Sequence, residues 1–295
     1  MQEMSLIRLA IPKGSLQTST IELFKDAGWI IGTSSRSYFP TIDDADIECA
    51  LVRAQEVSRY VESGLFDLAL TGKDWILENG SDVVEVADLV YSKATQKPAK
   101  WVLAVADASP IKTIHDLKGK KIATELVNFT RQFFRERGIP VEVEFSWGAT
   151  EAKVVEGLAD AIVEVTETGS TIRAHNLRII DELLVTNTKL IANRKSWRDP
   201  KKRSKIEQIA LMLKSALQAA GMVGLKMNAP KDSLEAVIRM LPALTSPTVS
   251  PLHDPQWYSL EIIINESHSR SLIPELLKAG ARGIIEYPLK KVLDG

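Results

Sequence analysis

The sequence predicts an α/β protein made of two strand–helix domains followed by a smaller domain of the ferredoxin-like type. Up to Ala192, short apolar runs alternate with helical periodicities, which implies crossover units and mostly parallel sheets. A polar segment, Thr-Gln-Lys-Pro-Ala-Lys, interrupts this alternation near residue 95 and marks a hinge. After Gly221 the expected order becomes β-α-β-β-α-β, the ferredoxin-like plan. The length of 295 residues fits several domains.

The first domain begins with the apolar run IRLAI. Pro12-Lys13-Gly14-Ser15 then supplies a turn and a helix start, and Gly28 ends the helix. The run ADAIVEV in the second domain has the apolar character of a buried strand. In these two domains we expect strands at 7–11, 47–52, 66–70, 101–106, 121–124, 141–145 and 161–165, and further helices at 54–63, 113–118, 128–137 and 150–157.

Later in the chain, an apolar run at 189–192 precedes a long amphipathic helix. Its apolar residues recur every three or four positions from Ile206 to Ala220. In the third domain we expect strands at 222–227, 257–264 and 282–287 and helices at 231–240 and 268–279. The expected domains are therefore 1–95 plus 185–220, then 96–184, and finally 221–295.

Composition excludes several classes of protein. Hydrophobic residues make up 45% and charged residues 25%, so the chain is globular rather than disordered. A net charge of −1 gives no general electrostatic reason to bind nucleic acid or an acidic membrane, and we expect neither partner. The single cysteine, Cys49, cannot form an intrachain disulfide, and the four histidines lack metal-ligand spacing. The N-terminal sequence does not resemble a signal peptide, and no apolar run is long enough to span a membrane. We therefore expect a cytoplasmic protein.

The turn that follows ADAIVEV, Thr166 to Thr171, is rich in hydroxyl groups and contains Gly169. A helical pattern follows it at 171–177. A strand that ends in such a turn at a helix start suits a phosphate, because backbone N–H groups, hydroxyls and the helix dipole can all face the anion. Glu164 and Glu167 could accept hydrogen bonds from the two hydroxyls of a ribose. The alternative is an ordinary helix N-terminus without a ligand, and these residues alone leave both interpretations open.

This turn resembles the phosphoribosyl-diphosphate loop of the ATP phosphoribosyltransferases, the enzymes of the first step of histidine biosynthesis. The resemblance covers nearly the whole chain in the family's order. It rests on IRLAIPKGSL, VRAQEVSRYVESGLFDLALTGKDWILE, KGKKIATELVNFTRQFFRERGI, APKDSLEAVIRMLPALTSPTVSPL and AGARGIIEYPLKKVL. It implies a two-domain core like that of the type II periplasmic binding proteins, followed by an ACT-like regulatory domain of the long form.

The resemblance also implies a reaction. N1 of the ATP purine attacks the anomeric carbon of 5-phosphoribosyl 1-diphosphate, diphosphate leaves, and Mg²⁺ takes part, although the metal ligands are not identified. Glu164 and Glu167 would stabilise the positive charge on the ribose, and Lys13 and Arg53, with Lys73, the negative charge on diphosphate. The implied substrate contacts are completed by Val165, Thr166, Thr168, Gly169, Ser170, Thr171, Thr71, Gly72 and Asp74.

Two positions depart from the family pattern. Glu164 stands where relatives often have Asp, and Ser15 where many have Arg. Each implied role has a simpler alternative: Lys13 and Arg53 could be solvated surface charges, and Asp74 could cap a helix at 75–79.

For the third domain the resemblance implies feedback inhibition by L-histidine. The site would be shared between subunits of a homo-oligomer, a dimer or hexamer, at residues Asn228, Leu244, Ser246, Thr248, Ile263 and Gly283. Ordinary turn chemistry would account for the Ser-Pro and Thr residues equally well. The alternative interpretation of the whole chain is that it is a non-catalytic small-molecule-binding or sensor protein on the same two-domain scaffold.

Overall fold

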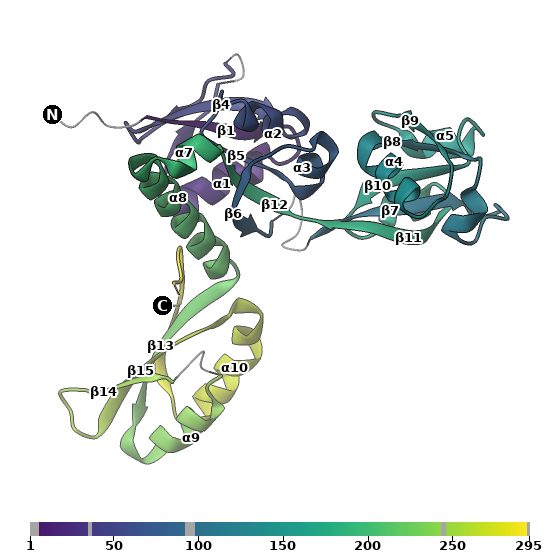
Figure 1. The fold of residues 1–295 in the computed structure, drawn as a ribbon. Coiled ribbons are helices and arrows are strands. Elements are labelled where there is room, and N and C mark those ends of the chain that lie inside the picture. Colours follow the sequence, from purple (N-terminus) through teal and green to yellow (C-terminus); the bar gives the residue numbers. More distant parts are fainter. Residues whose placement is uncertain (1–5, 35–36, 92–97, 243–245, 294–295) are drawn as a thin grey trace. The chain divides into compact units, whose positions relative to one another are not determined.

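The computed structural model describes residues 6–34, 37–91, 98–242 and 246–293. The chain divides into two compact units, Met1–Leu211 and Met212–Gly295. The first unit contains two five-stranded sheets, which we call the sheets of lobe I and lobe II, and the second contains a four-stranded sheet (Figure 1). None of the helices in the described ranges has the length and apolarity needed to cross a membrane. The domain boundaries expected near residues 95, 185 and 220 stay predictions.

The lobe I sheet has the strand order β4-β1-β5-β12-β6. Strands β4, β1 and β5 are parallel, and β12 runs antiparallel to its neighbours β5 and β6. Strand β6 stands at one edge and pairs with β12. Its strands are β1 (Ile7–Lys13), β4 (Ile47–Arg53), β5 (Leu68–Gly72), β6 (Val84–Leu89) and β12 (Thr188–Ala192).

Helices connect these strands, and a small hairpin precedes β4. Helix α1 ends at Gly28, whose φ of 110° is in the left-handed region that glycine adopts without strain. The elements are α1 (Gln17–Ala27), β2 (Ile31–Gly32), β3 (Thr41–Ile42), α2 (Ala54–Glu62), α3 (Lys73–Asn79), α7 (Arg194–Arg198) and α8 (Pro200–Ala219).

The lobe II sheet has the order β11-β7-β10-β8-β9, with β10, β8 and β9 parallel. Apolar residues cover both of its faces, because alternate residues of β7 enter different cores: Trp101 and Leu103 one, Val102 and Ala104 the other. Its elements are β7 (Ala99–Ala106), a 3₁₀ turn (Ile114–Leu117), β8 (Lys121–Thr124), α4 (Val127–Glu136), β9 (Glu142–Phe145), α5 (Thr150–Val155), β10 (Ala161–Thr166), α6 (Ser170–Ala174) and β11 (Leu177–Thr186).

The expectation of mostly parallel sheets is wrong, because two of the four strand pairings in each sheet are antiparallel. Two expected helices are also wrong, and two strands were not predicted. The helix expected at 171–177 is only α6, because Asn176 adopts a left-handed φ of 55° and Leu177 begins β11. The helix expected at 113–118 is the 3₁₀ turn, held by a reciprocal capping box between Thr113 and Asp116. Strands β6 and β11 were not expected, since their mixed apolar and charged residues lack a clear period of two.

The C-terminal unit has the predicted β-α-β-β-α-β order and the strand order β14-β15-β13-β16. One face of the sheet packs against both helices through a core that includes Leu225, Ile262, Val237 and Leu276. The elements are β13 (Met222–Pro230), a 3₁₀ turn (Lys231–Ser233), α9 (Leu234–Met240), β14 (Thr248–Pro251), β15 (Trp257–Asn265), α10 (Glu266–Ala279) and β16 (Arg282–Pro288).

Candidate functional site

The carboxyl ends of the lobe I strands bring basic and polar residues together. Lys13 ends β1 and Arg53 ends β4, and the two are register partners on neighbouring strands. Gly72 ends β5 immediately before α3. Ligands of open α/β sheets bind at this edge, where helix starts and loops converge.

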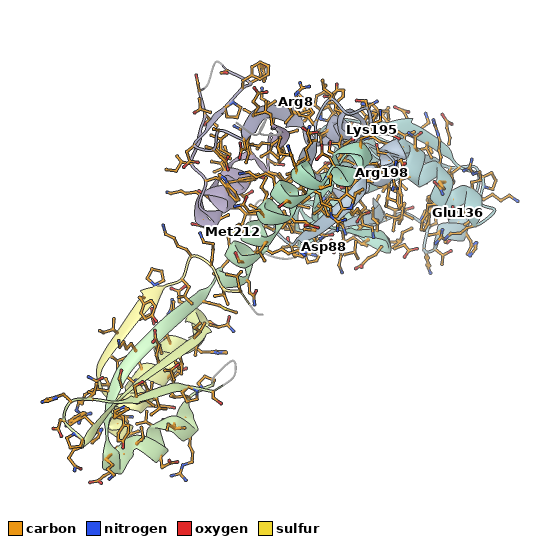
Figure 2. The ribbon with its side chains drawn as sticks, turned by 60° about the vertical axis from the view of Figure 1, so that its left-hand side comes forward. Arg8, Asp88, Glu136, Lys195, Arg198 and Met212 are labelled. Carbon is orange, nitrogen blue, oxygen red and sulfur yellow. The ribbon has the colours of Figure 1, made fainter. Side chains whose placement is uncertain are left out.

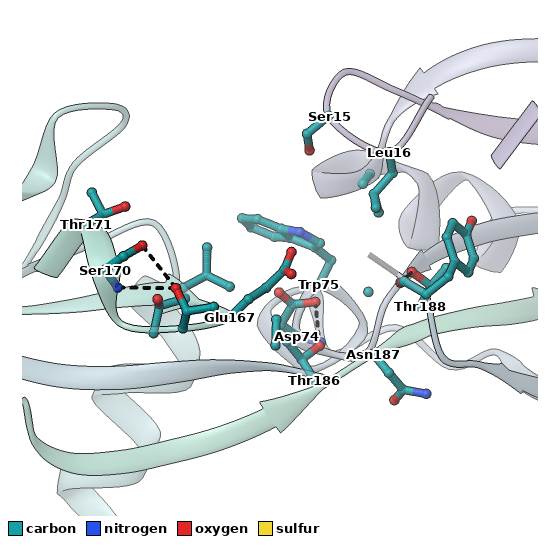
Figure 3. A pocket seen from close by; sticks show the side chains of 17 residues that line it. Ser15, Leu16, Asp74, Trp75, Glu167, Ser170, Thr171, Thr186, Asn187 and Thr188 are labelled. Atoms are coloured by element: carbon teal, nitrogen blue, oxygen red, sulfur yellow. Dashed lines mark hydrogen bonds between the residues drawn. The ribbon is translucent and has the colours of Figure 1, made fainter. Parts of the chain in front are cut away.

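A cavity of about 470 Å³ lies between this edge and the loop after β10 (Figure 3). Glu167 extends from the loop toward Asp74 and Trp75. The cavity is lined by Ser15, Leu16, Ala54, Gly72, Asp74, Trp75, Tyr91, Ala99, Val165, Thr166, Glu167, Thr168, Ser170, Thr171, Thr186, Asn187 and Thr188. A second cavity, of about 300 Å³, is lined by Lys13, Arg53, Pro12, Gly14, Gln55 and four residues of the first: Ser15, Leu16, Ala54 and Trp75. The two cavities are therefore adjacent and share part of their walls, and we refer to them together as the cleft.

The structure brings most of the predicted site residues to this cleft. Predicted residues of both lobes line the larger cavity, and Lys13 and Arg53 line the smaller. Four predicted residues line neither: Thr71, Lys73, Glu164 and Gly169. The Thr71 hydroxyl donates to the Ala54 carbonyl at 2.7 Å, and the Lys73 amide donates to the Asn187 carbonyl at 3.1 Å, so these groups hold the backbone of the cleft.

The loop after β10 makes its own hydrogen bonds. The Gly169 amide donates to Thr166 Oγ1 at 2.8 Å, and the Ser170 amide donates to Thr168 Oγ1 at 3.4 Å. Gly169 has a φ of 72°, and a Cβ there would lie 2.8 Å from the Arg173 guanidinium. The expectation that these amides are open to an anion is thus corrected, because side chains of the same loop already occupy them. Helix α6, five residues long, also supplies less dipole than the expected helix.

Glu164 lies among other carboxylates. Burial, together with the charges of Glu151 and Glu125, raises its pKa to about 7, although hydrogen bonds from the Val165 amide and Thr150 oppose the shift. The Val165 amide donates to Glu164 Oε1 at 3.1 Å. Burial likewise raises the pKa of Glu125, which also has a hydrogen bond with Gln55. This part of lobe II therefore favours a nearby positive charge.

Asp74 does not cap α3, because Gly72 occupies the N-cap position and the helix begins at Lys73. Instead the Asp74 carboxylate accepts hydrogen bonds from Trp101 Nε1 at 2.7 Å and from Thr186 Oγ1 at 3.0 Å. Burial raises its pKa, and these hydrogen bonds oppose the shift. A Cβ on Gly72 would lie 1.9 Å from Asp74 Oδ1, so the side chain requires glycine there.

The two predicted cations each lie over an exposed aromatic ring. Lys13 Nζ is 4.0 Å from the ring centre of Tyr38, and the Arg53 guanidinium is 4.7 Å from that of Trp147. These cation–π contacts hold both side chains at the smaller cavity.

Sequence reasoning missed several lining residues. Trp75 lines both cavities. It follows directly after Asp74 in the segment GKDWILE, so its place beside a predicted site residue is the signal that could have identified it. Tyr91 follows β6, Asn187 lies between β11 and β12, and Thr188 begins β12; no motif marks these positions. Within the described part of the chain, no group of three or more His, Cys, Asp or Glu side chains could hold a metal ion.

In the C-terminal unit, three of the predicted regulatory residues share one face of the sheet. Register pairing places Asn228, Ile263 and Thr248 on the face opposite the helices. A Cβ on Gly283 would lie 3.8 Å from Asn228 Nδ2, so these two positions are adjacent. Ser246 precedes β14, and Leu244 lies outside the described residues.

Comparison with known proteins relates both units to one family. The model of HisG, ATP phosphoribosyltransferase, matches residues 53–215, and that of the HisG C-terminal domain matches residues 219–291. The ATP phosphoribosyltransferase of Desulfatibacillum aliphaticivorans is 64% identical, covering 97% of this chain and 98% of the relative. The ATP phosphoribosyltransferase of Solidesulfovibrio magneticus is 63% identical, covering 98% of this chain and 99% of the relative.

A solved structure agrees with these matches. The ATP phosphoribosyl transferase (HisG:HisZ) complex from Thermotoga maritima has a TM-score of 0.61 at 29% identity, covering 71% of this chain and 96% of that chain. The family models, the near full-length relatives and this structure lead to the same result. The chain belongs to the ATP phosphoribosyltransferase family.

Proposed function

We propose that the cleft between lobes I and II is the active site of this pentosyltransferase. In it, N1 of the adenine of ATP attacks C1 of 5-phosphoribosyl 1-diphosphate, the C1–O bond to diphosphate breaks, and phosphoribosyl-ATP forms. N1 carries a free lone pair, so the attack needs no strong general base. Positioning two large anionic substrates therefore supplies most of the acceleration.

The charges around the cleft suit this reaction. Positive charge develops on the ribose in the transition state, and Glu164, with Glu125 and Glu151 close enough to raise its pKa, lies in a region of negative potential. Lys13 and Arg53 line the smaller cavity and would neutralise the departing diphosphate. Thr166, Thr168, Ser170 and Thr171 offer hydroxyls to the 5′-phosphate from the larger cavity.

The phosphate would have to exchange its bonds with those that the loop now makes internally. The amides of Gly169 and Ser170 become available to the anion when Thr166 and Thr168 turn their hydroxyls away. An anion that accepts from both amides and both hydroxyls would compensate for the two lost bonds. This exchange explains how a loop whose amides are occupied can still bind phosphate.

Mg²⁺, when bound, supplies charge neutralisation to the diphosphate. The described residues contain no ready-made metal cluster, and both carboxylate oxygens of Asp74 already accept hydrogen bonds. This fits a Mg²⁺ ion held mainly by phosphate oxygens, as Mg²⁺ in phosphoryl-binding sites commonly is. Glu167, which lines the cavity, is the carboxylate that we propose to complete its shell.

The observation that carries this proposal is that the Thr166–Thr171 loop and the Lys13–Arg53 pair line two adjacent cavities with shared walls. The test incubates the purified protein with ATP, phosphoribosyl diphosphate and Mg²⁺ and separates the products by chromatography. We expect phosphoribosyl-ATP and diphosphate in equal amounts, and loss of turnover in the double variant K13A/R53A. Binding of phosphoribosyl diphosphate without any product would instead favour a non-catalytic binding protein.

For the C-terminal unit we propose an ACT-like regulatory domain that binds L-histidine. The support is its topology together with the shared face of Asn228, Ile263 and Thr248. We further propose domains at 1–95 plus 185–220, 96–184 and 221–295, a dimer or hexamer, and action in the cytoplasm, where a single thiol stays reduced. Turnover with and without histidine, alongside light scattering for the oligomer mass, tests the regulatory part.

A further inference from the structure

Helix α3 follows directly on β5 of lobe I, yet two of its carboxylates bond to lobe II. Asp74 lies near the start of the helix, and Glu78 lies four residues later, one turn further along. Trp75, between them, packs against the lobe II core and makes an edge contact with Trp101, with ring centres 6.3 Å apart. The helix is therefore anchored in both lobes.

Glu78 caps a helix of the other lobe. The amide of Asn128 donates to Glu78 Oε1 at 3.0 Å, and the amide of Phe129 donates to Oε2 at 2.9 Å. In return, Asn128 Nδ2 donates to the Glu78 carbonyl at 3.2 Å. Burial raises the pKa of Glu78, while hydrogen bonds from the amides of residues 127–129 and the charge of Arg131 oppose the shift.

The cap replaces one that α4 does not have in its own sequence. The residue at its N-cap position, Leu126, is apolar and makes no side-chain cap bond. The first amides of a helix have no partner within the helix, and a capping side chain contributes about 1 kcal/mol. Here that partner comes from lobe I, so this bond exists only while α3 and α4 lie together.

Asp74 joins the start of α3 to the first and last strands of lobe II. Trp101, which donates to Asp74, lies on β7, the first strand of lobe II. Thr186, which also donates to it, ends β11, the last strand of that lobe. Asp74 thus bonds to both strands by which the chain enters and leaves lobe II. Glu78 makes a contact between the lobes that would break if they moved apart, as would those of Arg53 with Trp147 and of Gln55 with Glu125.

We propose that Glu78 is a positioning residue: by capping α4 across the cleft, it holds the two lobes in the arrangement that binds substrate. The role in catalysis rests on the function proposed above, whereas the cap itself does not. If Glu78 raises the fraction of molecules that are competent to bind, its loss weakens apparent affinity in proportion to that fraction. Saturating substrate would restore the arrangement, so the maximal rate would change little.

The test compares Glu78→Gln with Glu136→Gln. Glutamine keeps the size of Glu78 but leaves one carbonyl oxygen for two amides. Glu136 lies exposed at the far end of α4, where its loss removes a charge and one contact with Gln132 (Figure 2). For E78Q we expect KM for phosphoribosyl diphosphate to rise about three- to tenfold with kcat within about twofold, as a population shift requires. E136Q should match the wild type in both constants.

Amide hydrogen exchange provides a readout without substrate. In ligand-free E78Q, Asn128 and Phe129 should exchange faster than in the wild type, and phosphoribosyl diphosphate should slow them again. Equal exchange rates at Asn128 and Phe129 in E78Q and the wild type would overturn the inference. A lower kcat for E78Q at unchanged KM would also overturn it, because that result indicates loss of folded enzyme. A wild type without turnover would instead refute the proposed function, and exchange would still decide whether Glu78 caps α4 and whether ligand tightens that cap.

Discussion

The indole N–H of Trp101 donates to the buried carboxylate of Asp74 at 2.7 Å, joining the first strand of lobe II to helix α3. Both residues are nearly inaccessible to solvent. A buried carboxylate depends on such donors, because an unsatisfied polar group in the interior is costly. The bond therefore stabilises the contact between the lobes and also fixes Asp74, which lines the larger cavity.

We predict that Trp101→Phe lowers the free energy of unfolding by about 1–3 kcal/mol, as loss of a donor to a buried acceptor does. Because the smaller ring also leaves a cavity, the bond is isolated by a double-mutant cycle with Asp74→Ala, whose methyl group cannot accept a hydrogen bond, measured by urea unfolding. We expect the two changes to be clearly non-additive. Strict additivity would mean that the bond contributes nothing to stability.

Gly169 offers a test of the loop with a matched control. Alanine at Gly169 or at Gly157 meets a similar backbone cost, since their φ values are 72° and 69°. Only at Gly169 would the new Cβ crowd a side chain, the Arg173 guanidinium at 2.8 Å, whereas nothing lies within 4 Å at Gly157. We expect G169A to lower kcat/KM for phosphoribosyl diphosphate by about tenfold or more, equivalent to about 1.4 kcal/mol, and G157A to change it little. Similar losses in both would falsify the assigned role of the loop.

Glu164 predicts an unusual pH dependence of stability. Its pKa in the folded protein is about 7, raised by burial from an ordinary value of 4.5. Between these values the folded state keeps a proton that the unfolded chain has lost, so stability falls as pH rises through this window. Glu164→Gln should remove this fall and raise the melting temperature at pH 8, by about 2–4 °C for each kcal/mol gained.

The same substitution should reduce activity. In the proposed mechanism the carboxylate form of Glu164 stabilises the positive ribose, so kcat/KM of the wild type should rise as pH increases through about 7. E164Q should show low activity without that rise, while Glu156→Gln, a change of an exposed charge in the same lobe, keeps the wild-type profile. A stable E164Q enzyme with an unchanged profile would remove Glu164 from the mechanism.

The proposed histidine site in the C-terminal unit predicts a change in inhibition that leaves turnover without histidine unaffected. Asn228→Ala should raise the histidine concentration for half-inhibition by about tenfold, equivalent to about 1.4 kcal/mol of binding. Turnover without histidine should stay at the wild-type level, because the substitution lies outside the cleft. Ser271→Ala, on the exposed side of α10, is the control. A wild type insensitive to histidine would show that this face has another role.

Much of the site could be predicted because its chemistry is local in sequence. The strand end, the glycine and the hydroxyls of the Thr166–Thr171 loop lie within a few residues of one another, as do Gly72 and Asp74. Lys13 and Arg53 are distant in sequence, but both end parallel strands, and parallel strands bring such ends to one edge. These positions follow from periodicity and from the resemblance together.

The rest depends on contacts that no local pattern contains. Nothing near Asp74 indicates that its partners are Trp101 and Thr186, which lie on the first and last strands of lobe II. Likewise, the missing cap of α4 could be noticed at Leu126, but its replacement by Glu78 requires the folded chain. The internal bonds of the Thr166–Thr171 loop could not be predicted, because the folded backbone decides which hydroxyls accept from its amides.

The position of β12 has a consequence for synthesis of the protein. Strand β6 pairs with β12, and β12 emerges from the ribosome only after all of lobe II. Until then the segment up to Leu89 has an incomplete sheet, whereas lobe II is one uninterrupted stretch that can fold while translation continues. Half-made chains would thus expose the edge of β5 and an unpaired β6, so chaperones would be needed most during that interval.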